Sequence, residues 1–123
     1  MKYNSLIRIL NLLSVKGVGP QRVRFIISHF GVNTDYFTLS SEALCKAPGI
    51  DLKTARSVRQ FSEWDYGKKE FDRTNRVGAQ IISFWDEEYP KLLKKIYDPP
   101  VLLYVKGMPL QKEMDCIGVV GTR

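Results

Sequence analysis

Two glycines on either side of Val18 form a segment that is suited to hold an anion. Gly17 and Gly19 permit a sharp turn and a close approach of the main chain to a ligand, because glycine has no Cβ. A helix that begins near Gly19 exposes N–H groups without internal partners at the positive end of its dipole, and both features favour a phosphate. The candidate phosphate-binding residues of this segment are Lys16, Gly17, Val18, Gly19, Arg22 and Arg24.

The same pattern recurs 32 residues later in the chain. Each copy is predicted to form a helix, a glycine-containing turn and a second helix, and the pair resembles the helix-hairpin-helix motif in tandem. Asp51 stands where the first copy has Gly19, and we expect its carboxylate to cap the following helix and to repel a phosphate. We therefore interpret the second copy as structural. The matched positions are Leu12 with Leu44, Gly17 with Gly49, Val18 with Ile50, Val23 with Ala55, and Arg24 with Arg56.

A purely structural interpretation of the first copy stays open. In that case the two glycines only form a compact turn, Val18 fills the core, and the domain docks a protein without touching DNA. Charge favours neither interpretation by itself. Residues 1–76 hold 13 Lys and Arg against 7 Asp and Glu, whereas residues 77–123 hold 6 of each. A localised positive field attracts polyanions such as nucleic acid, although a modest basic excess also serves solubility.

Apolar spacing predicts helices before Gly78 and strands after it. Residues at intervals of three and four form helical stripes in the first part, and Gly31 is expected to end the second helix. A further polar helix is predicted from about residue 64 to 75, with Trp64, Tyr66 and Phe71 turned inward. The first two stripes are Leu6, Ile9, Leu10 and Leu13, then Val23, Ile26, Ile27 and Phe30.

Strands are predicted at residues 79–84, 101–105 and 116–120, with a short helix opening at Tyr89-Pro90. The last two strands are apolar throughout, which is typical of a parallel sheet covered on both faces. The predicted fold class is α+β: an all-α helix-hairpin-helix domain over residues 1–76, then an αβ domain over residues 77–123. A buried parallel strand needs a following helix, so we expect this second domain to be incomplete.

Several linked motifs in the second half resemble the start of the core of the DprA/Smf (DNA-processing protein A) family. The family pattern reads Tyr-Pro, Leu, Asp-Pro-Pro, Leu-Tyr and Gly, followed by a strand that ends in Val-Gly-(Ser/Thr)-Arg. The matching residues are Tyr89-Pro90, Leu93, Ile96, Asp98-Pro99-Pro100, Leu102-Leu103-Tyr104, Lys106-Gly107 and Val119 to Arg123.

The resemblance implies an extended Rossmann-like domain that binds single-stranded DNA. Members of the family protect incoming DNA during natural transformation, help to load the RecA recombinase, form homodimers and are not known as catalysts. The resemblance also assigns Gly121, Thr122 and Arg123 to a phosphate-contacting loop. It implies no cofactor and no metal, and a bacterial cytoplasmic location fits the lack of a signal peptide or membrane-spanning run.

Other residues are interpreted structurally. The two cysteines are expected to be buried reduced thiols, and His29 has no expected catalytic role. Tyr97 is expected to pack, and Asp86 to Glu88 to form a solvated turn. An enzyme of the Rossmann-like type that acts on nucleotides is the remaining alternative, although we find no acidic or lysine set in an active-site pattern.

Overall fold

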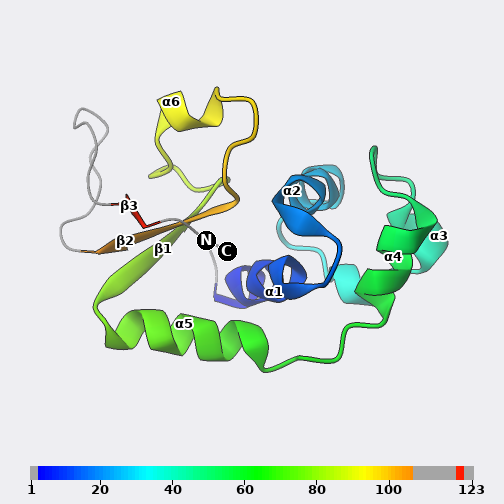
Figure 1. Ribbon diagram of the computed structural model, residues 1–123, viewed down its shortest axis with the longest axis horizontal. Coiled ribbons are helices and arrows are strands. Elements are labelled where there is room, and N and C mark those ends of the chain that lie inside the picture. Colours follow the sequence, from blue (N-terminus) through cyan, green and yellow to red (C-terminus); the bar gives the residue numbers. More distant parts are fainter. Residues whose placement is uncertain (1–2, 107–118, 121–123) are drawn as a thin grey trace. The chain divides into compact units, whose positions relative to one another are not determined.

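The computed structural model describes residues 3–106 and 119–120, which fall into two compact units (Figure 1). The first unit ends at Lys68 and the second begins at Lys69, so the division lies inside helix α5 (Tyr66–Arg76). The expected domain ranges, 1–76 and 77–123, stay a prediction. Each unit is described separately below.

Helices make up the first unit. They are α1 (Tyr3–Ser14), α2 (Gly19–Phe30), the single 3-10 turn η1 (Tyr36–Thr38), α3 (Ser41–Leu44) and α4 (Leu52–Arg59). Gly31 ends α2 as predicted: its φ is 94°, and its N–H donates to the Ile27 carbonyl at 2.7 Å. Ser40 caps α3, because its side-chain oxygen accepts a hydrogen bond from the Ala43 N–H at 3.1 Å.

The apolar stripes of α1 and α2 form most of the core of this unit. Leu6, Ile9 and Leu10 are buried as predicted, but Leu12 is fully buried whereas Leu13 is only partly so. Helical spacing puts Leu12 about 60° around the helix from Ile9, so its burial widens the packed face of α1 beyond the predicted stripe. Burial of each Leu or Ile side chain stabilises the folded state by roughly 1.5 to 3 kcal/mol relative to leaving it exposed.

Asn11 of α1 holds the start of α5 in place. Its side-chain Oδ1 accepts from the Gly67 N–H at 2.7 Å, and its Nδ2 donates to the Trp64 carbonyl at 3.4 Å. The inward orientation expected for Trp64 and Tyr66 is wrong, because these side chains are 54% and 37% exposed. This segment is held by hydrogen bonds between its main chain and Asn11, and not by burial of its aromatic rings.

The second unit contains a three-stranded sheet in the order β1 (Ala79–Ser83), β2 (Leu102–Lys106) and β3 (Val119–Val120). Both pairings are antiparallel, with Ile81 opposite Tyr104 and Val105 opposite Val119. The expectation of a parallel arrangement is therefore wrong for the described strands. The chain between β1 and β2 forms only the short helix α6 (Lys91–Lys94) and returns in the opposite direction, so no crossover is needed. The α+β class itself is confirmed.

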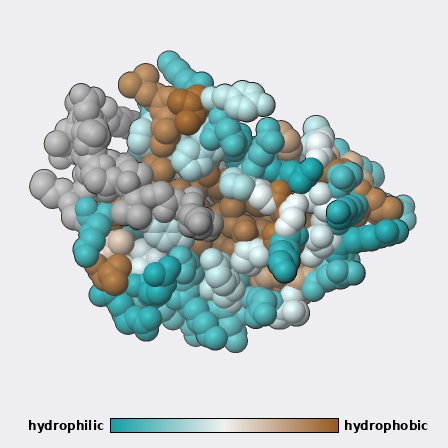
Figure 2. Space-filling view, in the orientation of Figure 1, coloured by the Kyte–Doolittle hydropathy of each residue, from teal (hydrophilic) through white to brown (hydrophobic). Residues whose placement is uncertain are grey.

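The sheet packs around a small cluster of buried side chains: Ile82, Tyr89, Leu103 and Val105, with Phe84 and Leu93 at its edge. The hydroxyl of Tyr89 donates to the Pro100 carbonyl at 2.7 Å and so fixes the two ends of the connecting segment. Tyr97 does not pack as expected but is 92% exposed. Only Leu93 of α6 joins the cluster, while brown, apolar surface remains visible over α6 (Figure 2).

Glu70 connects α5 to strand β2 within the second unit. Its carboxylate accepts from the Tyr104 hydroxyl at 3.0 Å and from Arg73 Nη2 at 2.7 Å. The other side of α5 is covered by charged side chains and appears hydrophilic in Figure 2. The polar composition of α5 thus suits a helix with one packed face.

Candidate nucleic-acid interface

The turn between α1 and α2 brings the predicted phosphate-binding glycines to the surface. Gly17 and Gly19 have φ values of 83° and 76°, and both are exposed. A Cβ at either position would meet nothing within 4 Å, so backbone conformation and not lack of space requires glycine here. Val18 between them is only 3% exposed. Val18 therefore anchors the turn in the core, while the main chain at Gly17 and Gly19 is exposed to solvent.

The N-terminus of α2 has no side-chain cap. Val18 occupies the N-cap position and makes no side-chain hydrogen bond, and Pro20 lies in the first turn without an N–H group. The first-turn N–H groups that remain, including that of Gln21, precede the intrahelical ladder and carry the positive end of the helix dipole. This end of α2 can therefore accept an anion.

Two cations lie at this turn. Lys16 is exposed, and Arg22 Nη1 donates to the Gly17 carbonyl at 3.2 Å, which keeps the guanidinium at the turn. Arg24 is half-buried and lies two residues on, roughly 200° around the helix from Arg22. The structure thus gathers Lys16, Gly17, Gly19 and Arg22 around one surface, whereas Arg24 lies on another side of α2.

The second hairpin repeats the turn geometry of the first. Val15 and Val18 donate to the carbonyls three residues before them at 3.2 and 3.3 Å, and the equivalent bonds from Ala47 and Ile50 measure 3.1 and 3.2 Å. Gly49 has a φ of 84°, close to the 83° of Gly17. Most of the matched apolar pairs are buried alike: Leu12 and Leu44, Val18 and Ile50, Val23 and Ala55. The sequence repeat is therefore a structural repeat.

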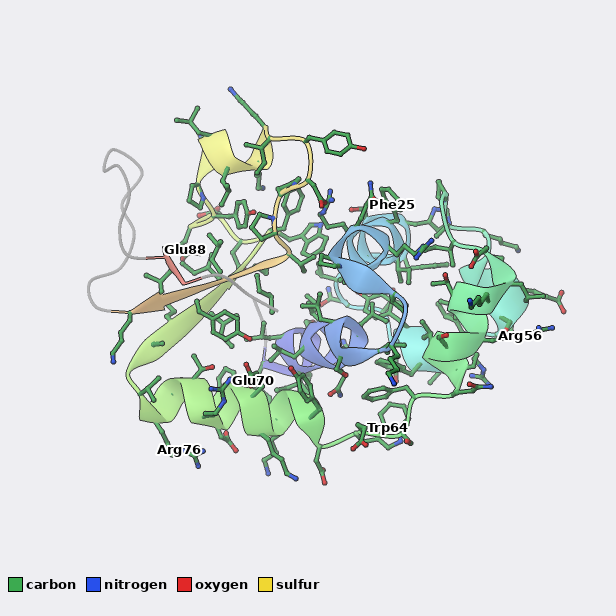
Figure 3. All side chains as sticks on the ribbon, viewed as in Figure 1. Phe25, Arg56, Trp64, Glu70, Arg76 and Glu88 are labelled. Atoms are coloured by element: carbon green, nitrogen blue, oxygen red, sulfur yellow. The ribbon has the colours of Figure 1, made fainter. Side chains whose placement is uncertain are left out.

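Gly49 also has a packing role that the sequence did not reveal. A Cβ there would lie 2.7 Å from Cδ2 of Phe25, which extends from α2 (Figure 3). The second turn thus packs closely against the Phe25 side chain of α2. No such contact exists at Gly17, where added atoms would enter open space. The two turns share the conformation of the first glycine but differ in their surroundings.

Asp51 caps α4, as predicted from the sequence. Its Oδ1 accepts from the Thr54 N–H at 2.8 Å. Hydrogen bonds with Thr54 lower the pKa of the Asp51 carboxyl, and the positive charge of Arg22 adds to this effect. The carboxylate is therefore ionised at neutral pH.

Gly121, Thr122 and Arg123 lie outside the described residues. Cys45 is a free, partly buried thiol, and Cys116 is again outside that range. Within the part of the chain that the structure describes, no group of three His, Cys, Asp or Glu side chains could hold a metal ion, and no helix could span a membrane.

Two family models match the chain. Residues 9–61 match a SAM-like helix-hairpin-helix tandem, and residues 80–123 match DNA recombination-mediator protein A. The chain is thus similar to a tandem helix-hairpin-helix domain over residues 9–61 and to a recombination-mediator protein over residues 80–123. More specifically, the resemblance to the DprA/Smf family is confirmed, because proteins of both names are among the relatives of this chain.

Relatives with different names share parts of this sequence. The DNA processing protein DprA of Bacillus subtilis is 47% identical over 47 residues, which are 37% of this chain and 16% of that protein. Protein Smf of Synechocystis is 26% identical over 117 residues, 89% of this chain and 28% of that protein. The UvrABC system protein C of Pseudomonas putida is 41% identical over 51 residues, 42% of this chain and 8% of that protein. The chain therefore spans less than a third of each of these relatives.

Proposed function

We propose that this protein is a non-enzymatic recombination mediator that binds single-stranded DNA in the bacterial cytoplasm. By the resemblance to the DprA/Smf family, it protects incoming DNA during natural transformation, helps to load RecA and forms homodimers as a full-length protein. The observation that carries the proposal is the match of residues 80–123 to DNA recombination-mediator protein A. A UvrABC system protein C shares part of this sequence too, so sequence similarity by itself does not define one activity.

Within this function, the first hairpin is the phosphate contact of the helical unit. The open N-terminus of α2 would face one phosphate, while Lys16 and Arg22 neutralise its charge. Such contacts hold the DNA backbone without reading bases, which suits a protein that acts on DNA of any sequence. The loop at Gly121, Thr122 and Arg123 is proposed as a second phosphate contact on the strength of the family motif alone.

Fluorescence anisotropy with a labelled single-stranded oligonucleotide tests this proposal. We expect binding that weakens on the order of tenfold when salt rises from 50 to 200 mM, as release of counterions from two or three phosphates requires. Gly19→Asp should weaken binding about tenfold or more, because it places a carboxylate at the N-terminus of α2. Gly19→Asn has the same shape without the charge and should lose less. Absence of any binding by the unmodified chain would show the proposal to be wrong.

A protein-docking role for the helical unit is the second candidate. The Trp64 side chain, which is 54% exposed, contacts Phe37 and Phe61 edge-on, with centroids 5.1 and 4.9 Å apart, and offers an aromatic contact to a partner (Figure 3). Trp and Tyr are enriched at protein interfaces. If Gly19→Asp left DNA binding intact while Trp64→Ala abolished binding to a partner protein, the docking role would replace the DNA role of this unit.

A further inference from the structure

Three large side chains on and just after α6 lie exposed. Leu92 and Ile96 are 77% and 48% exposed, and Tyr97 is almost fully exposed. The main chain keeps a helical turn through Ile96, whose N–H donates to the Leu93 carbonyl at 3.4 Å, so Leu92 and Ile96 share one side of this turn. Leu93 packs instead against the core cluster. The surface formed by Leu92, Ile96 and Tyr97, here called the α6 patch, is therefore not used by the core of its own unit.

Lysines surround the α6 patch. Lys91, Lys94 and Lys95 are all exposed, and Lys91 and Lys95 share the neighbouring side of the turn because they are four residues apart. Within residues 3–106 and 119–120, neither of these two lysines forms an ion pair, although Glu87 and Glu88 are exposed in the segment before α6. An apolar centre with a charged rim is the usual composition of a protein-binding surface.

Lys94 and Leu93 fix α6 to the core of its unit. The Lys94 ammonium lies 5.0 Å from the ring centroid of Phe84 and 6.0 Å from that of Tyr89, and the Leu93 side chain packs against the same cluster. The turn that carries the α6 patch is thus held in place before any partner arrives. A surface that is already ordered loses little conformational entropy on binding.

The lysines around the α6 patch discriminate between possible occupants. A second copy of this patch would bring the lysines of both copies together, and like charges disfavour that pairing. Binding to a lipid surface increases with the apolar area that is buried, and a single helical turn offers little. A nucleic-acid backbone would pair with the lysines but leave Leu92 and Ile96 without an apolar contact. An acidic protein segment with apolar side chains matches both the charge and the apolar surface.

We propose that the α6 patch, with Lys91 and Lys95 at its rim, is the docking surface for an acidic protein segment that carries large apolar side chains. The apolar side chains of the partner would cover Leu92 and Ile96, while its carboxylates pair with the two lysines. This surface uses no residue of the first hairpin, so the inference goes beyond the proposed DNA contact and does not depend on it.

Selection from a random peptide library displayed on phage, with the whole chain as bait, tests this inference. We expect the enriched peptides to combine Asp or Glu with Leu, Ile or Phe. A labelled synthetic copy of the most enriched peptide is then titrated by fluorescence anisotropy. Leu92→Ser should weaken its binding about tenfold, because a large apolar contact is lost. Lys91→Glu with Lys95→Glu should weaken it about tenfold or more, and by a smaller factor at high salt.

Two matched variants serve as controls. Leu52→Ser removes another leucine that is 45% exposed, at the start of α4. Lys68→Glu with Lys69→Glu makes the same change in net charge on the exposed surface of α5. Both should weaken peptide binding less than about twofold, because residues outside an interface contribute little to affinity. All of these positions are exposed, and circular dichroism melting checks that each variant is folded.

The inference is overturned if no peptide is enriched, if the enriched peptides lack acidic residues, or if the control variants weaken binding as much as Leu92→Ser. Binding to anionic phospholipid vesicles that Leu92→Ser abolishes would assign the α6 patch to a membrane instead. Self-association that Leu92→Ser abolishes in analytical ultracentrifugation would assign it to a second copy. Affinity for single-stranded DNA is measured in parallel: its absence would contradict the proposed function and leave this inference standing.

Discussion

At the scale of single residues, the decisive contrasts are between side chains in equivalent positions. Gly19 and Asp51 occupy the same place in two matching turns, yet one leaves a helix start open and the other closes it. Likewise Gly17 has open space around it whereas Gly49 lies against Phe25. The two matching segments of the helical unit therefore differ at individual positions: Gly19 has a φ of 76°, whereas Asp51 has a φ of −92° and caps its helix.

Tyr36 gives a pH-dependent prediction at this scale. Burial raises the pKa of its hydroxyl to about 12, and Arg8 partly offsets the shift. The unfolded chain then releases this proton near pH 10 whereas the folded protein keeps it, so stability is unaffected below pH 10 and falls between pH 10 and 12. The loss should reach roughly 2 to 3 kcal/mol.

Urea unfolding at pH 8, 10 and 11.5 measures this effect. Tyr36→Phe provides the control. It lacks the hydrogen bond from the Tyr36 hydroxyl to the Gly31 carbonyl, so it should be less stable by about 1 kcal/mol at pH 8. Because it has no hydroxyl to ionise, it should not show the part of the stability loss at high pH that Tyr36 causes. An equal fall in stability for both proteins would show that Tyr36 does not titrate as stated.

At the scale of elements, the N-terminus of α5 depends on a close approach to α1. A Cβ on Gly67 would lie 2.7 Å from the Ile7 carbonyl oxygen and 2.9 Å from Asn11 Oδ1. The first of these atoms belongs to the main chain of a helix and cannot move cheaply. Glycine is therefore required at this helical position by space and not by backbone conformation.

Gly67→Ala should destabilise the protein by about 1 to 3 kcal/mol, as overpacking at a buried contact does. Alanine has the higher helix propensity by about 1 kcal/mol, but the clash with main-chain atoms outweighs this gain. Lys68→Ala, at the exposed neighbouring position, is the matched control and should shift stability by less than about 0.5 kcal/mol. A thermal melt in which Gly67→Ala is as stable as the unmodified chain would contradict the packing argument.

At the scale of the whole molecule, the charge is divided unevenly along the chain. Residues 1–76 hold 13 basic and 7 acidic side chains, whereas residues 77–123 are balanced at 6 of each. Exposed cations nevertheless occur in both parts, with Lys91 and Lys95 at the ends of α6. A local site and a general positive field therefore make different predictions about which cations matter.

A pair of double variants distinguishes the two. Lys16→Ala with Arg22→Ala should weaken binding to single-stranded DNA about fivefold or more, because both cations lie at the open turn of the first hairpin. Lys91→Ala with Lys95→Ala removes the same charge elsewhere and should weaken it less than about twofold. Equal losses in anisotropy titrations would indicate that charge alone, and not the hairpin, attracts the DNA.

Much of the local structure of this protein could be predicted from its sequence. The 32-residue repeat, the helix end at Gly31 and the cap by Asp51 were all predicted, because turns and caps depend on residues within one helical turn of each other. The α+β class followed from the change in apolar spacing near Gly78. The family resemblance rested equally on short linked motifs, and the match over residues 80–123 confirms it.

Tertiary structure alone decided the features that join distant residues. Segments far apart in the chain form the packing of Gly49 against Phe25, the hydrogen bonds between Asn11 and the start of α5, and the antiparallel pairing of β1 with β2. Exposure of Trp64 and Tyr97 was mispredicted for the same reason. An aromatic residue signals burial only on average, whereas its actual exposure depends on which neighbours the fold places around it.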